Sequence, residues 1–107
     1  MNIVNRFIVA TYEEGRRVFN EKIDELADVW ARIIQEPAIN EFHRMAMTEI
    51  ILTLTPQLNE VINERVTDIE STIAHIRTNR RVCNELDMAI NTFQAILRHY
   101  PNRRAAE

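Results

Sequence analysis

Residues 57–100 read QLNEVINERVTDIESTIAHIRTNRRVCNELDMAINTFQAILRHY, a stretch with neither glycine nor proline. Apolar side chains recur at every seventh position of this stretch, namely Ile62, Ile69, Ile76, Cys83, Ile90 and Leu97. Seven residues make about two turns of an α-helix, so these side chains lie along one side of a helix. The spacing predicts one continuous helix over 57–100, about 66 Å long at a rise of about 1.5 Å per residue.

A helix of this length would exceed the size of the domain that the chain can form. A compact domain of about 100 residues has a radius of gyration of about 13 Å and measures roughly 35 Å across. The apolar side of the helix would then need a partner outside its own domain. We therefore expect the bundle to be completed by oligomerisation.

The composition predicts an all-α fold. The 107 residues include only one glycine and three prolines, too few for the many turns of a strand-rich protein. We expect a single helical domain over 1–100 and a frayed basic tail over 101–107, because Pro101 stops the last helix.

Two further helices are expected before residue 57. The first, over about 4–35, has an apolar stripe at helical spacing: Ile8, Tyr12, Phe19, Ile23, Leu26, Trp30 and Ile33. Gly15 lies on this stripe and would admit a close helix neighbour. Pro37 ends the first helix. The second helix, over about 38–54, is apolar on nearly all sides and is therefore expected to be buried, and Thr55-Pro56 is a start signal for the long third helix.

The apolar residues that flank the sevenfold stripe change from one side of it to the other near Asn79-Arg80. They are Val66 and Ile73 before that point, and Leu86 and Phe93 after it. A uniform coiled-coil zipper would not show this change, whereas a helix with one neighbour before residue 78 and another after residue 82 would. A turn over 78–81, giving four helices, is the alternative. The predicted interface comprises Ile62, Val66, Ile69, Ile73, Ile76, Cys83, Leu86, Ile90, Phe93 and Leu97.

The two halves of the predicted long helix differ in charge. Residues 57–75 carry four acidic side chains and one arginine, whereas 76–107 carry six arginines and three acidic side chains. Two copies packed antiparallel about Ile73 would bring opposite charges together, whereas a parallel pair would bring the two Cys83 side chains together. Both arrangements stay open.

Catalytic, cofactor and metal sites are not expected. The histidines, His43, His75 and His99, show no metal-binding spacing, and a single cysteine, Cys83, cannot form a zinc site alone. We interpret the histidines as surface or boundary residues and Cys83 as a buried structural thiol. One glycine cannot build a phosphate-binding loop, so the chain is not expected to be an enzyme or to take a small-molecule substrate.

Charged residues provide a second set of candidate contacts: Glu60, Glu64, Asp68, Arg77, Arg80 and Arg81. The three acidic residues recur every fourth position and could dock on a basic partner, although a solvated helix face explains them as well.

We therefore expect a non-enzymatic helical interaction module, a homodimeric scaffold or adaptor or a subunit of a helical complex. One alternative is a small acidic inhibitor or regulator that docks on a basic protein surface. Another is a helical nucleic-acid binder that uses the Arg-rich C-terminal part, although a net charge of −3 does not favour this partner. The lone cysteine and the lack of a signal peptide or membrane segment favour an intracellular setting, cytoplasmic or nuclear.

Overall fold

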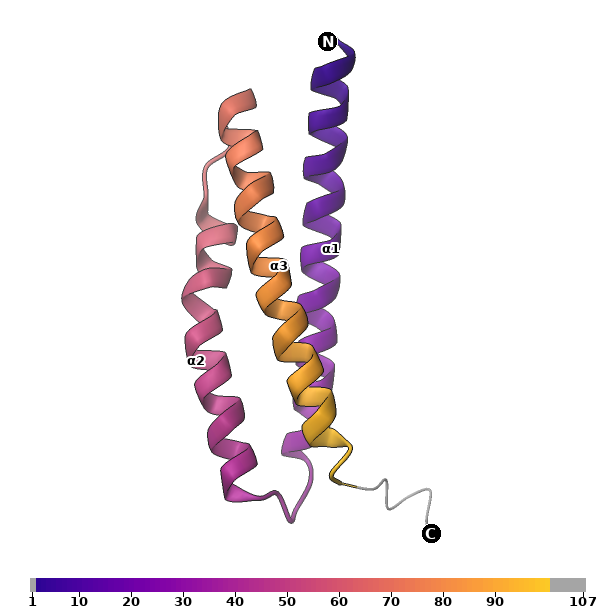
Figure 1. The fold of residues 1–107 in the computed structure, drawn as a ribbon, viewed down its shortest axis with the longest axis vertical. Helices are drawn as coiled ribbons and strands as arrows, with labels where there is room; N and C mark the ends of the chain where they lie inside the picture. The colour runs from indigo at the N-terminus through magenta and orange to yellow at the C-terminus, as the bar shows by residue number, and fades with distance from the viewer. Residues whose placement is uncertain (1, 101–107) are drawn as a thin grey trace.

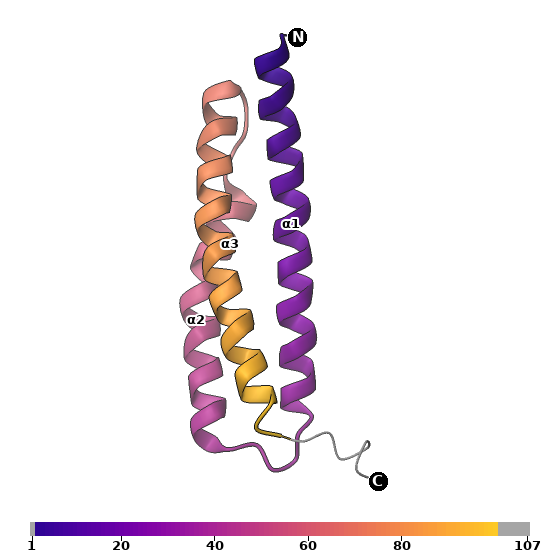
Figure 2. The same ribbon diagram turned by 45° about the vertical axis from the view of Figure 1, so that its right-hand side comes forward.

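The computed structural model describes residues 2–100, which form three helices: α1 (Ile3–Ile34), α2 (Glu41–Asn63) and α3 (Ile69–Leu97). Helices α1 and α3 run in the same direction and α2 runs in the opposite one (Figure 1). Helix α3 packs against both others, whereas no Cα atom of α1 lies within 8 Å of one of α2. The turned view shows the same elongated molecule, with α3 overlapping α2 and α1 standing beside them (Figure 2).

Each helix begins at a polar capping residue. The side chain of Asn2 accepts a hydrogen bond from the Asn5 N–H (2.8 Å), and that of Asn40 accepts one from the Phe42 N–H (2.7 Å). Asp68 accepts from the Ser71 N–H (2.8 Å) while Ser71 Oγ accepts from the Asp68 N–H (3.0 Å), a reciprocal capping box. These caps explain why α2 begins at residue 41 and not at 38, and why α3 begins at residue 69.

The prediction of one helix over 57–100 is wrong. Helix α2 continues through Pro56 to Asn63, and the chain reverses over 64–68 before α3 begins. Ile62 and Ile69 keep their sevenfold spacing across this reversal although they belong to different helices. The Asp68–Ser71 capping box gives α3 its own start, so the spacing alone was misleading.

Other predictions for the helices are confirmed. The described residues form an all-α bundle of three helices, and α1 lies within one residue of its expected bounds. Helix α3 is continuous across 78–81, so the four-helix alternative with a turn there is wrong. The expected tail over 101–107 lies outside the described residues.

Eight of the ten buried residues of α3 form a central stripe with steps of three and four: Thr72, His75, Asn79, Val82, Leu86, Ala89, Phe93 and Ile96. Helix α3 does have two neighbours, as its changing flank predicted, but they lie on its two sides along its length. Lys22 of α1 pairs with Asp87 on one side, and Glu60 of α2 pairs with Arg81 on the other.

Candidate interaction surface

Half of the predicted interface residues on α3 lie inside the chain itself. Cys83, Leu86, Ile90 and Phe93 are buried in the core that α3 forms with α1 and α2. They are therefore covered without a second molecule. The antiparallel dimer about Ile73 also loses its basis, because the continuous helix that it requires is replaced by α2 and α3.

The remaining predicted interface residues are scattered. Ile62 lies on α2 and is 57% exposed, and Val66 lies in the α2–α3 connection. Ile69 is the exposed first residue of α3. The other three are half-buried: Ile73, Ile76 and Leu97. Ile62, in the last turn of α2, and Ile69, at the start of α3, are thus the exposed ones, and both lie at a helix end.

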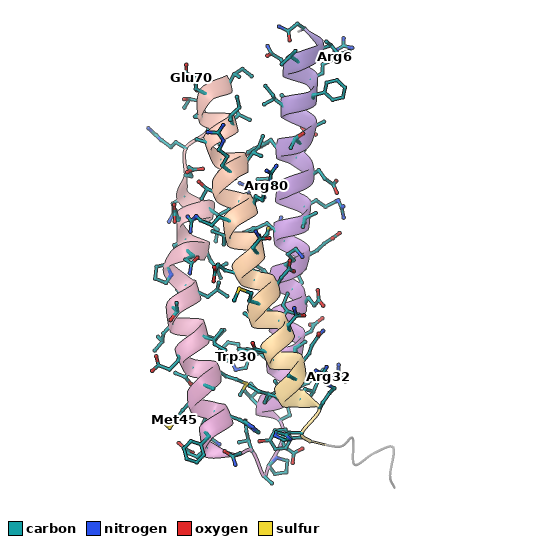
Figure 3. All side chains as sticks on the ribbon, viewed as in Figure 1. Arg6, Trp30, Arg32, Met45, Glu70 and Arg80 are labelled. Carbon is teal, nitrogen blue, oxygen red and sulfur yellow. The ribbon has the colours of Figure 1, made fainter. Side chains whose placement is uncertain are left out.

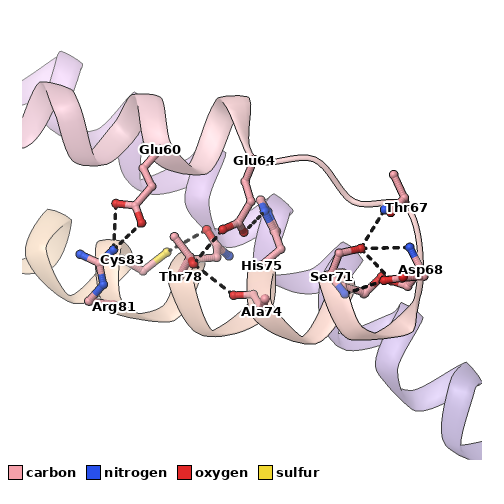
Figure 4. Close-up of polar contacts among 12 residues, drawn as sticks. Glu60, Glu64, Thr67, Asp68, Ser71, Ala74, His75, Thr78, Arg81 and Cys83 are labelled. Atoms are coloured by element: carbon pink, nitrogen blue, oxygen red, sulfur yellow. Dashed lines mark hydrogen bonds and ion pairs between the residues drawn. The ribbon is translucent and has the colours of Figure 1, made fainter.

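The acidic residues expected to form a docking strip have partners within the chain (Figure 4). Glu60 accepts hydrogen bonds from Arg81 through both carboxylate oxygens (3.0 and 2.9 Å). Glu64 Oε2 accepts one from the Thr78 hydroxyl (3.1 Å), and Asp68 caps α3. These carboxylates join α2 or the connection to α3 and do not form a strip free for a partner.

The arginines of the predicted docking set lie on α3 at steps of three and four residues from Arg77, and Arg81 is paired with Glu60. Arg77 and Arg80 are both exposed on α3. Arg80 lies between α1 and α3 (Figure 3) and lines an outer groove of about 470 Å³ with Phe7 and Val18 of α1.

A buried polar cluster joins the three helices near the α2–α3 connection. His75 is 1% exposed, and its Nδ1 lies 2.9 Å from Oε1 of Glu64. The Tyr12 ring of α1 lies against the His75 ring, with 5.2 Å between centroids. The interpretation of His75 as a surface or boundary residue is therefore wrong. Its spacing from Thr72 and Asn79, three residues before and four after, was the signal available in the sequence.

A second buried contact lies one turn further along α3. The Cys83 thiol donates to Oδ1 of Asn79, with 3.8 Å between sulfur and oxygen. Burial raises the pKa of the Cys83 thiol above its ordinary range. This burial favours the protonated thiol over the reactive thiolate.

Tyr100 closes the opposite end of the bundle. Its hydroxyl oxygen accepts a hydrogen bond from the Asn40 N–H (2.8 Å), so its proton is free to point to Nδ1 of His43 (2.6 Å). The ring of His99 stacks on that of His43, with centroids 4.8 Å apart. The α1–α2 connection, the start of α2 and the end of α3 are thereby linked.

The expectation that α2 is buried on nearly all sides is wrong. Phe42 and Leu52 are 80% and 63% exposed, and Met45 is exposed too. Figure 3 shows Met45 on the side of α2 away from α3. Helix α2 contacts only α3 among the other helices, which leaves its remaining sides uncovered.

Helix α1 also leaves large apolar side chains uncovered. Trp30 is 38% exposed and Ile34 is more so. The N-terminal turns of α1 expose Ile3, Val4 and Phe7 as well. In Figure 3, Trp30 of α1 lies in the space between the ribbons of α2 and α3.

The exposed apolar residues of α1 and α2 lie beside stripes that are buried. On α1, Ile23 and Trp30 follow the buried Phe19 and Leu26 by four residues each. We use the name inner strip for the exposed or half-buried residues Ile23, Trp30, Ile34, Ile51, Leu58 and Ile62.

Two outer grooves show which way the inner strip points. On α3 the grooves extend from Asn79 and Ala89, at the edges of the buried stripe, to exposed residues such as Asn84 and Met88 on the opposite side. Val18 of α1 and Thr53 of α2 line these grooves, and both lie on the other edge of their helix from the inner strip. The strip therefore faces the space between α1 and α2, on the side of the buried stripe of α3.

The fold places the chain in the all-α class, as a bundle of three helices. Comparison with protein-family models, with curated proteins and with solved structures finds no match. Within residues 2–100, no group of three or more His, Cys, Asp or Glu side chains is arranged to hold a metal ion. None of the helices described is long and apolar enough to cross a membrane.

Proposed function

We propose that the chain is a non-enzymatic helical interaction module that binds a further helix along the inner strip. The observation that supports this proposal is the separation of α1 from α2. Both lie close to α3, whereas no Cα atom of α1 lies within 8 Å of one of α2, and each helix has exposed apolar side chains on the side toward the other.

The arrangement corresponds to three corners of a four-helix bundle. In such a bundle each helix packs on two neighbours and presents an apolar side to each. Helix α3 has both of its neighbours here, whereas α1 and α2 have one each. A fourth helix in the open corner would cover Trp30, Ile34 and Ile62, which water otherwise contacts.

The acidic-regulator alternative receives less support. Its carboxylates, on Glu60, Glu64 and Asp68, are engaged within the chain. A basic partner would have to displace those contacts before it could dock.

Trp30 provides a direct test because it is the only tryptophan of the chain. Its fluorescence would be followed while an amphipathic helical peptide with leucine at heptad a and d positions is added, or while the protein is concentrated. We expect a shift to shorter wavelength in at least one titration, because docking removes water from the indole. A control peptide with asparagine at the same positions should cause no shift. An unchanged spectrum in both titrations would overturn the proposal.

A further inference from the structure

We infer that the open corner is filled by α2 of a second copy of this chain. In this dimer, a two-fold axis parallel to the helices relates the copies, and each α2 lies between α1 and α2 of the other. The inference rests on the proposed function and names the partner of the inner strip.

Three of the four sides of α2 are suited to burial. Met47, Leu54 and Val61 face α3 and are buried. The inner-strip side carries Ile51, Leu58 and Ile62 beside the exposed polar residues Arg44, Thr48, Thr55 and Asn59, and the side away from α3 carries Met45, Leu52 and Pro56. No charged residue occurs between Glu49 and Glu60. The three sides match the three neighbours that the dimer provides: α3, α2 of the second copy and α1 of the second copy.

The fourth side of α2 is suited to water. Glu49, Thr53 and Gln57 lie there, along the outer groove shared with α3. This side faces solvent in the dimer as it does in the single chain. The distribution of polar residues around α2 therefore agrees with three helix neighbours, although a single chain supplies only one.

Neither of the other helices is an equally good occupant. The side of α1 away from α3 carries Arg17, Glu21, Asp24 and Asp28, and Arg17 is already paired with Glu21. Burying such charges on both flanks would carry a large desolvation penalty. Helix α3 is already covered on two sides. Helix α2 is the segment of this chain with an uncharged surface still to cover.

The positions of the residues along the bundle axis also agree with the insertion of each α2 into the open corner of the other copy. The pairs Lys22–Asp87 and Glu60–Arg81 join α1 and α2 to successive turns of α3. At about 1.5 Å per residue, they place Trp30 roughly level with the first half of α2. In the dimer, Met45 and Leu52 of the second copy would then lie along Trp30 and Ile23, so that apolar residues meet apolar residues.

A second copy also explains more than an unrelated helix would. An unrelated helix in the corner would cover the inner strip but leave Met45 and Leu52 of α2 in water. The reciprocal exchange covers both surfaces in one step, because the same helix supplies the insert and one wall of the corner. A two-fold dimer repeats this contact twice.

The first experiment compares Leu52→Glu with Thr53→Glu by light scattering and sedimentation equilibrium of the full chain. Both positions are exposed on α2, so both variants should keep their helical circular dichroism. We expect the wild-type protein and Thr53→Glu to be dimers, and Leu52→Glu to dissociate about a hundredfold more readily or further. A dimer unaffected by Leu52→Glu would overturn the inference.

The second experiment uses disulfide formation to test whether the α2 helices of the two copies run parallel to each other. With Cys83→Ser as background, Thr55→Cys would place two thiols at equal height where the α2 helices face each other. We expect a cross-linked dimer on a non-reducing gel for Thr55→Cys and little for Thr53→Cys. Equal cross-linking of the two variants would overturn the parallel exchange.

The two proposals fail in different ways. In one outcome, the wild-type chain stays monomeric at all concentrations while Trp30 fluorescence responds to a helical peptide. That result would overturn the proposed dimer but not the proposal of a helical interaction module. A monomer whose Trp30 responds to nothing would overturn both.

Discussion

Gly15 of α1 lies directly against the Asn79 side chain of α3. A Cβ atom built on Gly15 would stand 2.7 Å from Nδ2 of Asn79, closer than two such atoms can approach. Asn79 is buried there, and its side-chain oxygen accepts a hydrogen bond from the Cys83 thiol. The only glycine of the chain therefore allows α1 and α3 to approach closely at a polar layer of the core.

We expect Gly15→Ala to lower the free energy of unfolding by about 1–3 kcal/mol, as overpacking in a core usually does. Alanine gains about 1 kcal/mol of helix propensity over glycine, so a purely local effect would have the opposite sign. Urea unfolding measures the difference. Gly15→Ala combined with Asn79→Ala should be less harmful than the sum of the single changes, and simple additivity would contradict the contact.

Two glutamates near the end of α2 allow the stability contributions of a partly buried and a half-exposed carboxylate to be compared. Glu64→Ala should destabilise the protein by about 1–3 kcal/mol, because it removes the carboxylate beside the buried His75 imidazole and the acceptor of the Thr78 hydroxyl. Glu60→Ala should change stability by less than about 1 kcal/mol, because the Glu60–Arg81 pair is half exposed. Chemical denaturation of both variants checks this order, and equal losses would contradict it.

Asp68 should contribute to the acid sensitivity of the fold. Its hydrogen bonds with Ser71 lower the pKa of the Asp68 carboxyl below its usual range. The carboxylate therefore stabilises the folded state above the ordinary aspartate pKa of about 3.9, and this contribution is lost as the pH falls through the lower folded value. Asp68→Asn can still cap α3 but does not titrate.

We accordingly expect a smaller fall in melting temperature for Asp68→Asn than for the wild-type protein as the pH falls from about 4 to 2. Thermal unfolding followed by circular dichroism measures both profiles. Asp68→Ala, which removes the cap, should melt lower at neutral pH as well. Parallel wild-type and Asp68→Asn profiles would show that the carboxylate has no such role.

Cys83 should be unreactive until the protein unfolds. It is buried, and burial raises its pKa, so both access and thiolate formation are limited. A coloured disulfide reagent at pH 8 should modify the native protein on the order of a hundredfold more slowly than the urea-unfolded chain. Comparable rates would mean that the α1–α3 contact opens readily.

Several local features could be predicted from residue patterns. The apolar stripe and Pro37 indicated α1 closely, because amphipathic spacing and proline act within a few residues. The unbroken phase from Ile76 to Cys83 indicated that α3 continues across 78–81. Gly15 on the stripe indicated a close helix neighbour, and α3 supplies it.

The chain reversal at 64–68 was not recognised. Pro56 looked like a helix start, yet α2 tolerates it in its interior. Ile62 and Ile69 remained in phase across a connection that spacing cannot reveal. The spacing of His75 and Asn79 hinted at their burial, but their contacts with Glu64 and Gly15 were hidden, since each contact joins residues of different elements that only the fold brings together.

The sequence by itself determined an all-α chain, because its apolar periodicity is helical and it has few turn-forming residues. Only the tertiary structure decided which apolar side chains are buried and which stay exposed. Once α2 folds back on α3, the apolar side of α3 is covered within the chain, and the uncovered sides belong to α1 and α2. Burial depends on which helices meet, and residue spacing along one helix cannot specify its neighbours.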